Sequence, residues 1–309
     1  MTQGREMHWI FKRGLGGAVI GVASAIMVWS ARGAENAHPI PDFSGAWARN
    51  SMDPELPPSG PKPLVNLRRQ ENDPHLNGGG DPLPLVGDYN NPILKPKAAE
   101  IVKKAGELSA GGRINPDPSN QCAPYEPPYS FAIQLGVQML QKKDEIVMLY
   151  PQDDQVRRVR LNATHPKKII PSAMGDSVGH YEGASLVIDT VGIKVGPVSM
   201  VDRYGTPHSE ALHLIERYRF IDVADAKAAM ERHERRAGHA GAAQFDPEYK
   251  GLQLEYTVED PNMFTTPWSA QITYRRTTQV WSEQICAENI VEYWPGMNIG
   301  VPKAAEPDF

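Results

Sequence analysis

Cysteine is scarce in this chain: Cys122 and Cys286 are the only two among 309 residues. Two isolated cysteines do not make a structural zinc site, which takes four ligands. Neither stands beside a histidine or at a glycine-rich helix start, so a catalytic thiol is the weaker interpretation. In an oxidising compartment we expect one disulfide between Cys122 and Cys286, whose long loop contributes roughly 4–5 kcal/mol in the chain-entropy model.

Basic residues are also in deficit, with 32 Lys and Arg against 37 Asp and Glu and a net charge of −5. Such a chain, with no basic run, is a poor candidate for binding nucleic acid or an anionic membrane. The sequence has no P-loop and no dinucleotide fingerprint, so we expect no cofactor. A serine triad built on Ser177 or Ser209 rests on the presence of the residue types alone, and we disfavour it.

Long apolar runs are absent too. The run Leu15–Trp29 is shorter than the roughly 20 residues that span a bilayer as a helix. It follows a basic start and precedes small residues, which predicts a signal peptide over residues 1–33 that is cleaved before Ala34. An uncleaved N-terminal anchor is the alternative. Cleavage implies a periplasmic or secreted protein with no stable membrane insertion.

Proline divides the chain, because 17 of its 28 prolines fall between Pro39 and Pro128. Proline excludes long helices and central strands, so we expect residues 34–131 to be extended and to wrap a scaffold. The exception is Pro96–Leu108, whose apolar residues recur at helical spacing before a Gly-Gly stop.

From Phe131 onward the sequence changes to short apolar or alternating runs. We expect strands at Ala132–Leu140, Glu145–Tyr150, Gln155–Leu161, Ala184–Val191, Ala211–Phe220, Leu252–Val258, Ala270–Arg275 and Val280–Cys286. Because helices do not alternate with them, the predicted fold is all-β, a lipocalin-like antiparallel barrel with a proline-rich N-terminal wrap and short helices. The single domain covers 34–309, with the barrel at 132–290, a helical insertion at about 223–250 and a tail at 291–309.

The first predicted strand carries a known signature. Asp42–Trp47 reads Asp-Phe-Ser-Gly-Ala-Trp, and its Gly-x-Trp is similar to the lipocalin motif. That resemblance implies that Trp47 closes the barrel floor and that an arginine from a late strand, Arg275 or Arg276, stacks over it.

Longer motifs carry a second resemblance. They are Asp42–Trp47, Asp117–Pro124, Gln155–Leu161, His165-Pro166, Gly175–Thr190, Pro207–Arg217, Asp260-Pro261, Pro267-Trp268 and Cys286–Asn289. With these motifs the chain resembles a family of uncharacterised secreted bacterial proteins over nearly all of the predicted mature chain. Two departures are Tyr181, where the family has tryptophan, and Ala184, where it has aspartate.

Carboxylates and histidines are concentrated in Gly175–Arg217. On the later strand, Glu216 shares a face with apolar neighbours, so burial of that face would desolvate its carboxylate. Such a group is a candidate general acid or base, and the alternative is a buried glutamate tied to an arginine. Glu182 is the second candidate, if Gly179–Val191 is one strand that places it beside Leu186. Asp189 is interpreted as a turn cap.

The remaining candidates are loop or strand-end residues. His165, His208, His213 and Asp176 complete the catalytic set, and Arg217, Tyr181, Trp268 and Ser209 are the candidate substrate-binding residues. His208, Glu210 and His213 have the chemistry to hold a divalent metal. A three-residue step on a strand puts side chains on opposite faces, however, so metal binding at His208 and His213 is the weaker interpretation.

These residues predict an exported, cofactor-independent enzyme of lyase, hydratase or isomerase type that acts on a small hydrophobic or aromatic molecule. Glu216 or Glu182 would be the base, His165 or His208 the acid, and Arg217 an orienting cation. The alternative is a lipocalin-like periplasmic carrier without catalysis, and a third possibility is a structural envelope protein. The enzyme hypothesis requires the ionisable groups to meet in one water-poor hollow.

Overall fold

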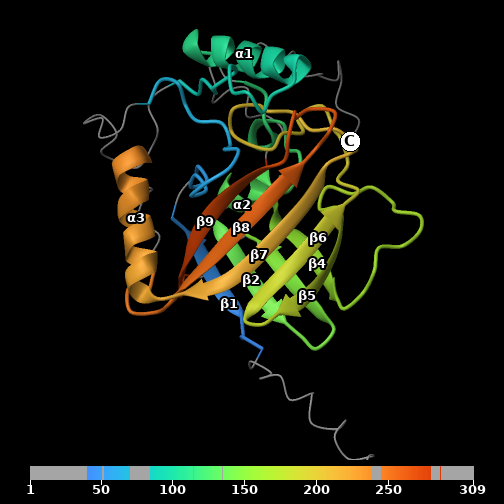
Figure 1. Cartoon of the computed structure of the whole chain (residues 1–309), viewed down its shortest axis with the longest axis vertical. Helices are drawn as coiled ribbons and strands as arrows, with labels where there is room; N and C mark the ends of the chain where they lie inside the picture. The colour runs from blue at the N-terminus through green and yellow to red at the C-terminus, as the bar shows by residue number, and fades with distance from the viewer. Residues whose placement is uncertain are drawn as a thin grey trace, which may run out of the picture. The chain divides into compact units, whose positions relative to one another are not determined.

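The computed structural model describes residues 40–50, 52–69, 84–113, 115–133, 135–237, 245–279 and 286. The strands in this part of the chain form a closed barrel, in which each pairs with the next and β1 pairs with β9 (Figure 1). They are β1 (Gly45–Arg49), β2 (Gly136–Gln141), β3 (Glu145–Tyr150), β4 (Gln155–Leu161), β5 (Asp176–Glu182), β6 (Ser185–Val191), β7 (His213–Ile221), β8 (Gly251–Glu259) and β9 (Trp268–Arg276). The accompanying α-helices are α1 (Pro96–Ala110), α2 (Tyr129–Ile133) and α3 (Val223–Ala237).

The ring is antiparallel except between β4 and β5, which run parallel with Val159 opposite Ser177. A ring of nine strands requires this, because an odd number of strands cannot alternate in direction all the way round. The predicted all-β barrel is therefore confirmed, but the prediction of a wholly antiparallel ring is wrong at this one pair. A parallel pair needs a crossover, and residues 162–175 supply it as a loop that projects from the barrel wall (Figure 1).

A second difference concerns residues 179–191, which were expected to form one strand. Gly183 adopts φ of 58° and turns the chain back, so that β5 and β6 form a hairpin. Glu182, just before the turn, is consequently exposed, whereas Leu186, just after it, is fully buried. The turn separates faces that a continuous strand would have shared.

Side chains fill the barrel interior. β7 alternates as predicted, with Leu214, Glu216 and Tyr218 buried while His213 and Arg217 face outward. The side chains of Met148, Tyr150 and Tyr218 on β3 and β7 are at most 2% exposed and belong to one continuous core. These inward side chains pack against one another in that core.

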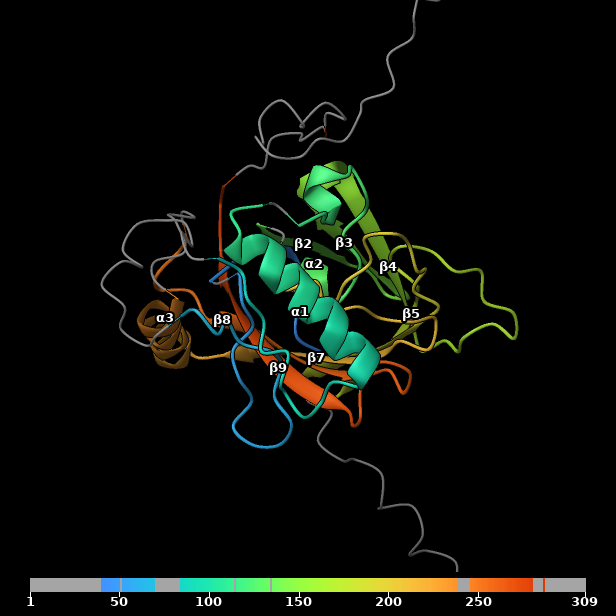
Figure 2. The same ribbon diagram turned by 90° about the horizontal axis from the view of Figure 1, so that it is seen from above.

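Helices close one end of the barrel, which we call the mouth. Phe131 of α2 enters the core, and its ring lies 5.4 Å from that of Tyr256. The predicted helix is present as α1, which lies across the mouth and adds Ala98 and Val102 to the same core (Figure 2). It begins at Pro96, because proline is tolerated at the first helical position.

Extended segments and one helix pack outside the wall. Glu55 exchanges backbone hydrogen bonds of 2.7 and 3.0 Å with Gln271 of β9. The predicted charged helix is present as α3, which lies along β8 and β9 (Figure 1). At Gly251 a Cβ atom would come within 2.7 Å of Ala226, so glycine lets this helix approach β8 closely.

The predicted disulfide between Cys122 and Cys286 is present and joins positions 164 residues apart. It ties the segment that leads to α2 to the chain beyond β9. In the part of the chain with described coordinates, no helix combines the length and apolar character needed to cross a membrane. The predictions for residues 1–33, 280–285 and 291–309 lie outside the described residues.

The Gly-x-Trp signature is located as the sequence implied. Trp47 is fully buried, and Arg276 of β9 stacks over it with Cζ 5.2 Å from the ring centroid. Arg276 Nη1 also donates to the Ser44 carbonyl at 2.6 Å. Position 45 requires glycine, because its φ is 126° and a Cβ atom there would overlap the guanidinium of Arg276. Of the two candidate arginines, Arg276 has the stacking role.

We predict that Gly45→Ala lowers the free energy of unfolding by about 2–4 kcal/mol, since it adds backbone strain and displaces Arg276 from Trp47. Urea unfolding followed by tryptophan fluorescence measures this. Gly60→Ala is the matched control, because Gly60 also has positive φ (85°) but open space around it. Equal losses in the two variants would show that the stack contributes nothing.

Candidate functional site

An ion pair lies inside the barrel. Glu216 and Arg157 are 0% and 1% exposed, and Arg157 Nη1 donates to Glu216 Oε2 at 2.9 Å. Tyr218 donates to the same oxygen at 3.2 Å, while Arg157 also donates to Ser177 Oγ (3.1 Å) and Thr190 Oγ1 (2.7 Å). Burial alone would lower the pKa of Arg157, but the charge and hydrogen bonds of Glu216 raise it above its ordinary value. Arg157 is therefore charged.

Arg157 is a residue that the sequence analysis missed. The alternation of β4 puts Arg157 on the same inward face as Val159 and Leu161, so the signal was present in the pattern. Glu216 has no exposed surface through which a substrate could reach it. The structure thus favours the alternative interpretation, a buried glutamate tied to an arginine, over a general base.

We predict that Glu216→Leu alone lowers the free energy of unfolding by about 3–5 kcal/mol, because it leaves the Arg157 guanidinium buried and unpaired. The double variant Arg157→Met/Glu216→Leu should lose less than either single variant, since Ser177 and Thr190 still bond each other at 3.0 Å. A double-mutant cycle by denaturant unfolding measures the coupling. Additive losses would contradict the assignment.

A second group forms a chain across the outer wall, which we call the outer chain. His165 contacts Asp176 Oδ1 through Nδ1 (2.6 Å) and Asp189 Oδ1 through Nε2 (3.1 Å). His213 Nε2 contacts the same Asp189 oxygen at 3.0 Å, and its Nδ1 contacts Glu259 Oε2 at 3.2 Å. The structure thus brings together three predicted site residues through Asp189, which links two imidazoles rather than capping a turn.

The number of N–H groups that the two imidazoles can offer limits the protonation state of the outer chain. All four ring nitrogens face carboxylate oxygens, and a neutral imidazole has only one N–H. With Asp176, Asp189 and Glu259 ionised, all four contacts are hydrogen bonds only when His165 and His213 are both protonated. Hydrogen bonds from Arg160 hold the pKa of Asp176 below its usual value, against the opposing effect of burial. The side chains of the outer chain are partly exposed. Through His165, the outer chain holds the start of the 162–175 loop against Asp176 of β5 and Asp189 of β6.

Glu182 and Arg217 form a third, separate group. Arg217 Nη2 donates to Glu182 Oε2 at 2.7 Å, and His180 Nε2 lies 3.0 Å from Oε1. Arg217 and His180 hold the pKa of Glu182 below its usual value. Both partners are at least 40% exposed. An exposed glutamate paired in this way is a weak base, so neither residue has the environment predicted for a catalytic role.

A fourth group lies in a pocket beside the mouth. The pocket has a volume of about 430 Å³ and is lined by Pro124 and Glu126, by Pro171–Ala173 and by residues between 194 and 199. His208 is fully buried behind it, with Nε2 2.9 Å from Glu126 Oε2. We call Glu126 and His208 the mouth pair.

The tautomer of His208 follows from its other contact. Its Nδ1 lies 3.1 Å from the Ser209 carbonyl oxygen, which can only accept, so Nδ1 carries a proton. Nε2 and Glu126 Oε2 must then share one further proton. The mouth pair is thus either imidazolium with carboxylate or imidazole with carboxylic acid, and it holds one transferable proton at the pocket wall. Glu126 was not predicted, since it stands in the proline-rich region as Tyr-Glu-Pro-Pro.

The other predicted binding residues have structural partners. Ser209 Oγ donates to Asp260 Oδ1 at 2.8 Å, which fixes the corner before β7. Trp268 is 2% exposed and packs edge-on against Phe264 with centroids 5.7 Å apart. Tyr181 packs against the core, and burial raises its pKa. None of the three lines the pocket beside the mouth.

Metal binding at His208 and His213 is not supported. No three His, Cys, Asp or Glu side chains within the described ranges are grouped so that they could hold a metal ion. His208 belongs to the mouth pair and His213 to the outer chain. The single polar hollow expected from the sequence is replaced by four groups, of which only the mouth pair combines burial with a pocket.

One buried acid near the mouth has a shifted titration. Burial raises the pKa of Asp202 to about 6, although hydrogen bonds from Thr206 and Tyr204 oppose the shift. Its pKa in the unfolded chain is about 3.9. The folded state therefore retains a proton between these values, and the stability that this proton contributes is lost as pH rises through about 6.

We predict that Asp202→Asn is more stable than the wild type at pH 7.5, by about 2–3 kcal/mol, because the amide oxygen can still accept from the two backbone N–H groups without a buried charge. The difference should shrink towards zero near pH 4, where the folded wild type is protonated. Thermal unfolding across this pH range measures it. Parallel stability curves for the two proteins would contradict the assignment.

Comparison of the chain with protein-family models, with curated proteins and with solved structures found no match. The resemblance to secreted bacterial proteins therefore stays a prediction.

Proposed function

We propose that the protein is an exported, cofactor-independent acid–base enzyme of lyase or isomerase type, with the mouth pair as its proton-transfer group. The observation that carries the proposal is the 2.9 Å contact between buried His208 and Glu126 at the wall of the 430 Å³ pocket. Of the predicted acid–base residues, His208 remains in the proposed site as the partner of Glu126, Glu126 replaces Glu216 and Glu182 as the base, and His165 is left to the outer chain.

The chemistry follows from the shared proton. With His208 as imidazolium, Glu126 is a carboxylate that can accept a proton from an acidic C–H bond of a molecule in the pocket, and the electron pair of that bond remains on the substrate. Glu126 then returns the proton to another carbon, which is isomerisation, or to a leaving group that the electron pair expels, which is elimination. The imidazolium, held by the Ser209 carbonyl, offsets the charge of the carboxylate before the proton transfer and that of the substrate anion after it.

The pocket lining supports an apolar substrate with one polar group. Ala123, Pro124, Pro171, Pro197 and Val198 supply apolar walls. Lys194 lines the same pocket and supplies a cation that favours negative charge developing on the substrate. This combination suits a small aromatic or aliphatic molecule that carries a carbonyl or carboxylate.

Export is part of the proposal. The Cys122–Cys286 disulfide supports it, because such bonds persist in oxidising compartments. The disulfide also anchors the chain next to Ala123 and Pro124, which form one wall of the pocket. In an oxidising compartment outside the cytoplasm the disulfide would stay formed and would hold this wall of the pocket in position.

We predict that Glu126→Gln lowers proton-transfer activity by about 10²–10⁴-fold, since the amide cannot accept the proton. The probe is phenylpyruvate, an aromatic keto acid with an acidic C–H bond, and the measurement is its keto–enol interconversion and exchange with deuterated water by NMR. Glu182→Gln is the matched control, because Glu182 is also paired with a histidine but is exposed and does not line the pocket.

Activity in Glu126→Gln equal to that of the wild type, or an equal loss in both variants, would refute the role of the mouth pair. Saturable binding of phenylpyruvate without any exchange in the wild type would instead favour the carrier, with its ligand in the pocket rather than inside the barrel.

A further inference from the structure

The crossover loop 162–175 has a composition unlike that of the whole chain. It carries Lys167 and Lys168 and no acidic residue, although the chain as a whole has a net charge of −5. Residues 192–201, the first part of the neighbouring loop between β6 and β7, carry Lys194 and again no acid, and the acids of that loop, Asp202 and Glu210, come later. The charge of the whole chain therefore does not describe this surface, which is locally cationic.

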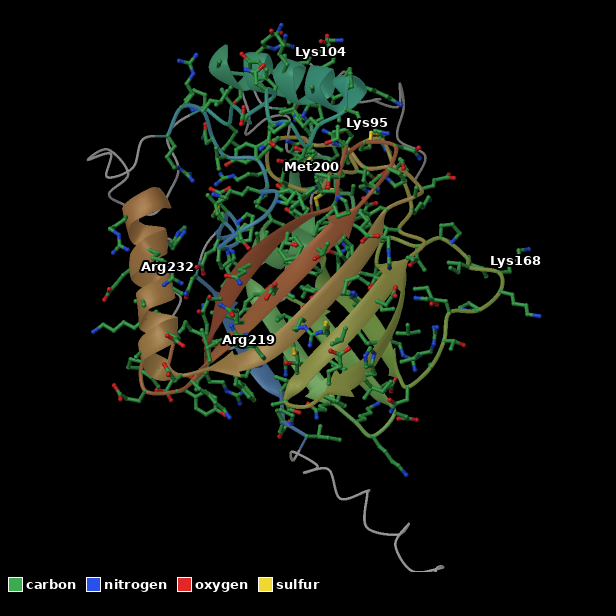
Figure 3. All side chains as sticks on the ribbon, in the orientation of Figure 1. Lys95, Lys104, Lys168, Met200, Arg219 and Arg232 are labelled. Atoms are coloured by element: carbon green, nitrogen blue, oxygen red, sulfur yellow. A yellow bond between two sulfur atoms is a disulfide. The ribbon has the colours of Figure 1, made fainter. Side chains whose placement is uncertain are left out.

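The same two loops expose apolar side chains. Ile170 is 82% exposed, more than any other large hydrophobic residue in the described part of the chain, and Val195 is 40% exposed. Lys168 projects into solvent from the loop, away from the barrel wall (Figure 3). Residues 167–170 thus combine two lysines with an exposed isoleucine, which makes this part of the loop amphipathic. We call these residues the basic tip.

The basic tip is held in position at both ends of its loop. At the start, His165 contacts Asp176 and Asp189, and Arg160 donates to the Thr164 carbonyl at 3.4 Å. At the end, Ser172 N donates to the Gly192 carbonyl (3.2 Å), and Lys194 N donates to the Ser172 carbonyl (2.9 Å). These contacts join the two loops side by side, so that Ile170 projects from a fixed base.

We propose that the basic tip docks the protein on an anionic lipid surface. Lysines attract the negative headgroup layer, and an apolar side chain among them inserts at the boundary with the acyl chains, which is how peripheral segments bind such surfaces. Charge complementarity selects anionic lipid over a neutral surface, since residues 162–175 and 192–201 hold three lysines and no carboxylate. The neighbouring pocket is lined by Pro171–Ala173 of the same loop, so docking brings its entrance to the lipid.

The test is co-sedimentation of the full chain with vesicles of phosphatidylcholine alone or with about one quarter phosphatidylglycerol. We expect binding to the anionic vesicles only, and weakening by salt. Lys167→Gln/Lys168→Gln should lower the partition coefficient about 25-fold, at about fivefold per lysine. Ile170→Ser should lower it about tenfold by removing the inserted side chain.

Matched controls come from other surfaces of the same chain. Lys103→Gln/Lys104→Gln removes an adjacent, exposed lysine pair from α1, and Val156→Ser removes a 53% exposed apolar residue from β4. Both should bind vesicles like the wild type. The same loss in the controls as in the tip variants, or no binding of the wild type to anionic vesicles, would overturn the proposal, and binding to an acidic protein instead would then explain the lysines.

The docking proposal and the enzyme proposal are tested by different measurements, so that either one can be refuted while the other stands. The basic tip does not line the pocket, so the tip variants should retain activity on dissolved phenylpyruvate. Loss of vesicle binding with activity intact identifies a docking surface, whereas absence of activity in a wild type that binds vesicles leaves docking in place.

Discussion

An odd number of strands cannot close a barrel through antiparallel neighbours alone, and much of this structure follows from that constraint. The ring meets it with the parallel pair β4–β5, which obliges the chain to cross over outside the wall through residues 162–175. The crossover loop carries His165, one wall of the pocket and the basic tip. Three features with functional potential thus depend on one junction in the ring.

The interior and the mouth use ionisable groups in opposite ways. Inside, Arg157 and Glu216 satisfy one another within a filled core, and no surface of Glu216 is open to a substrate. At the mouth, the shared proton of His208 and Glu126 lies at the wall of a pocket. Burial and pairing alone do not make a catalytic group; access from a pocket separates the two cases.

The mouth is also where distant parts of the chain are tied together. The Cys122–Cys286 disulfide anchors the segment that leads to Glu126, while His208 approaches from the loop before β7. The opposite side of the pocket, Pro171–Ala173, is held by backbone hydrogen bonds that join Ser172 to Gly192 and Lys194. The shape of the pocket therefore depends on an oxidised disulfide and on the contact between two loops.

The sequence by itself determined the barrel class and the alternating faces of strands such as β7, because alternation and proline content are local properties. The Gly-x-Trp motif implied an arginine stacked on Trp47, and the structure decided that it is Arg276 rather than Arg275. The disulfide followed from there being only two cysteines. Only the tertiary structure decided which charges meet. Arg157 and Glu216 are 59 residues apart and Glu126 and His208 are 82 apart, so their pairing depends on strand register and on the parallel junction, neither of which a single strand records.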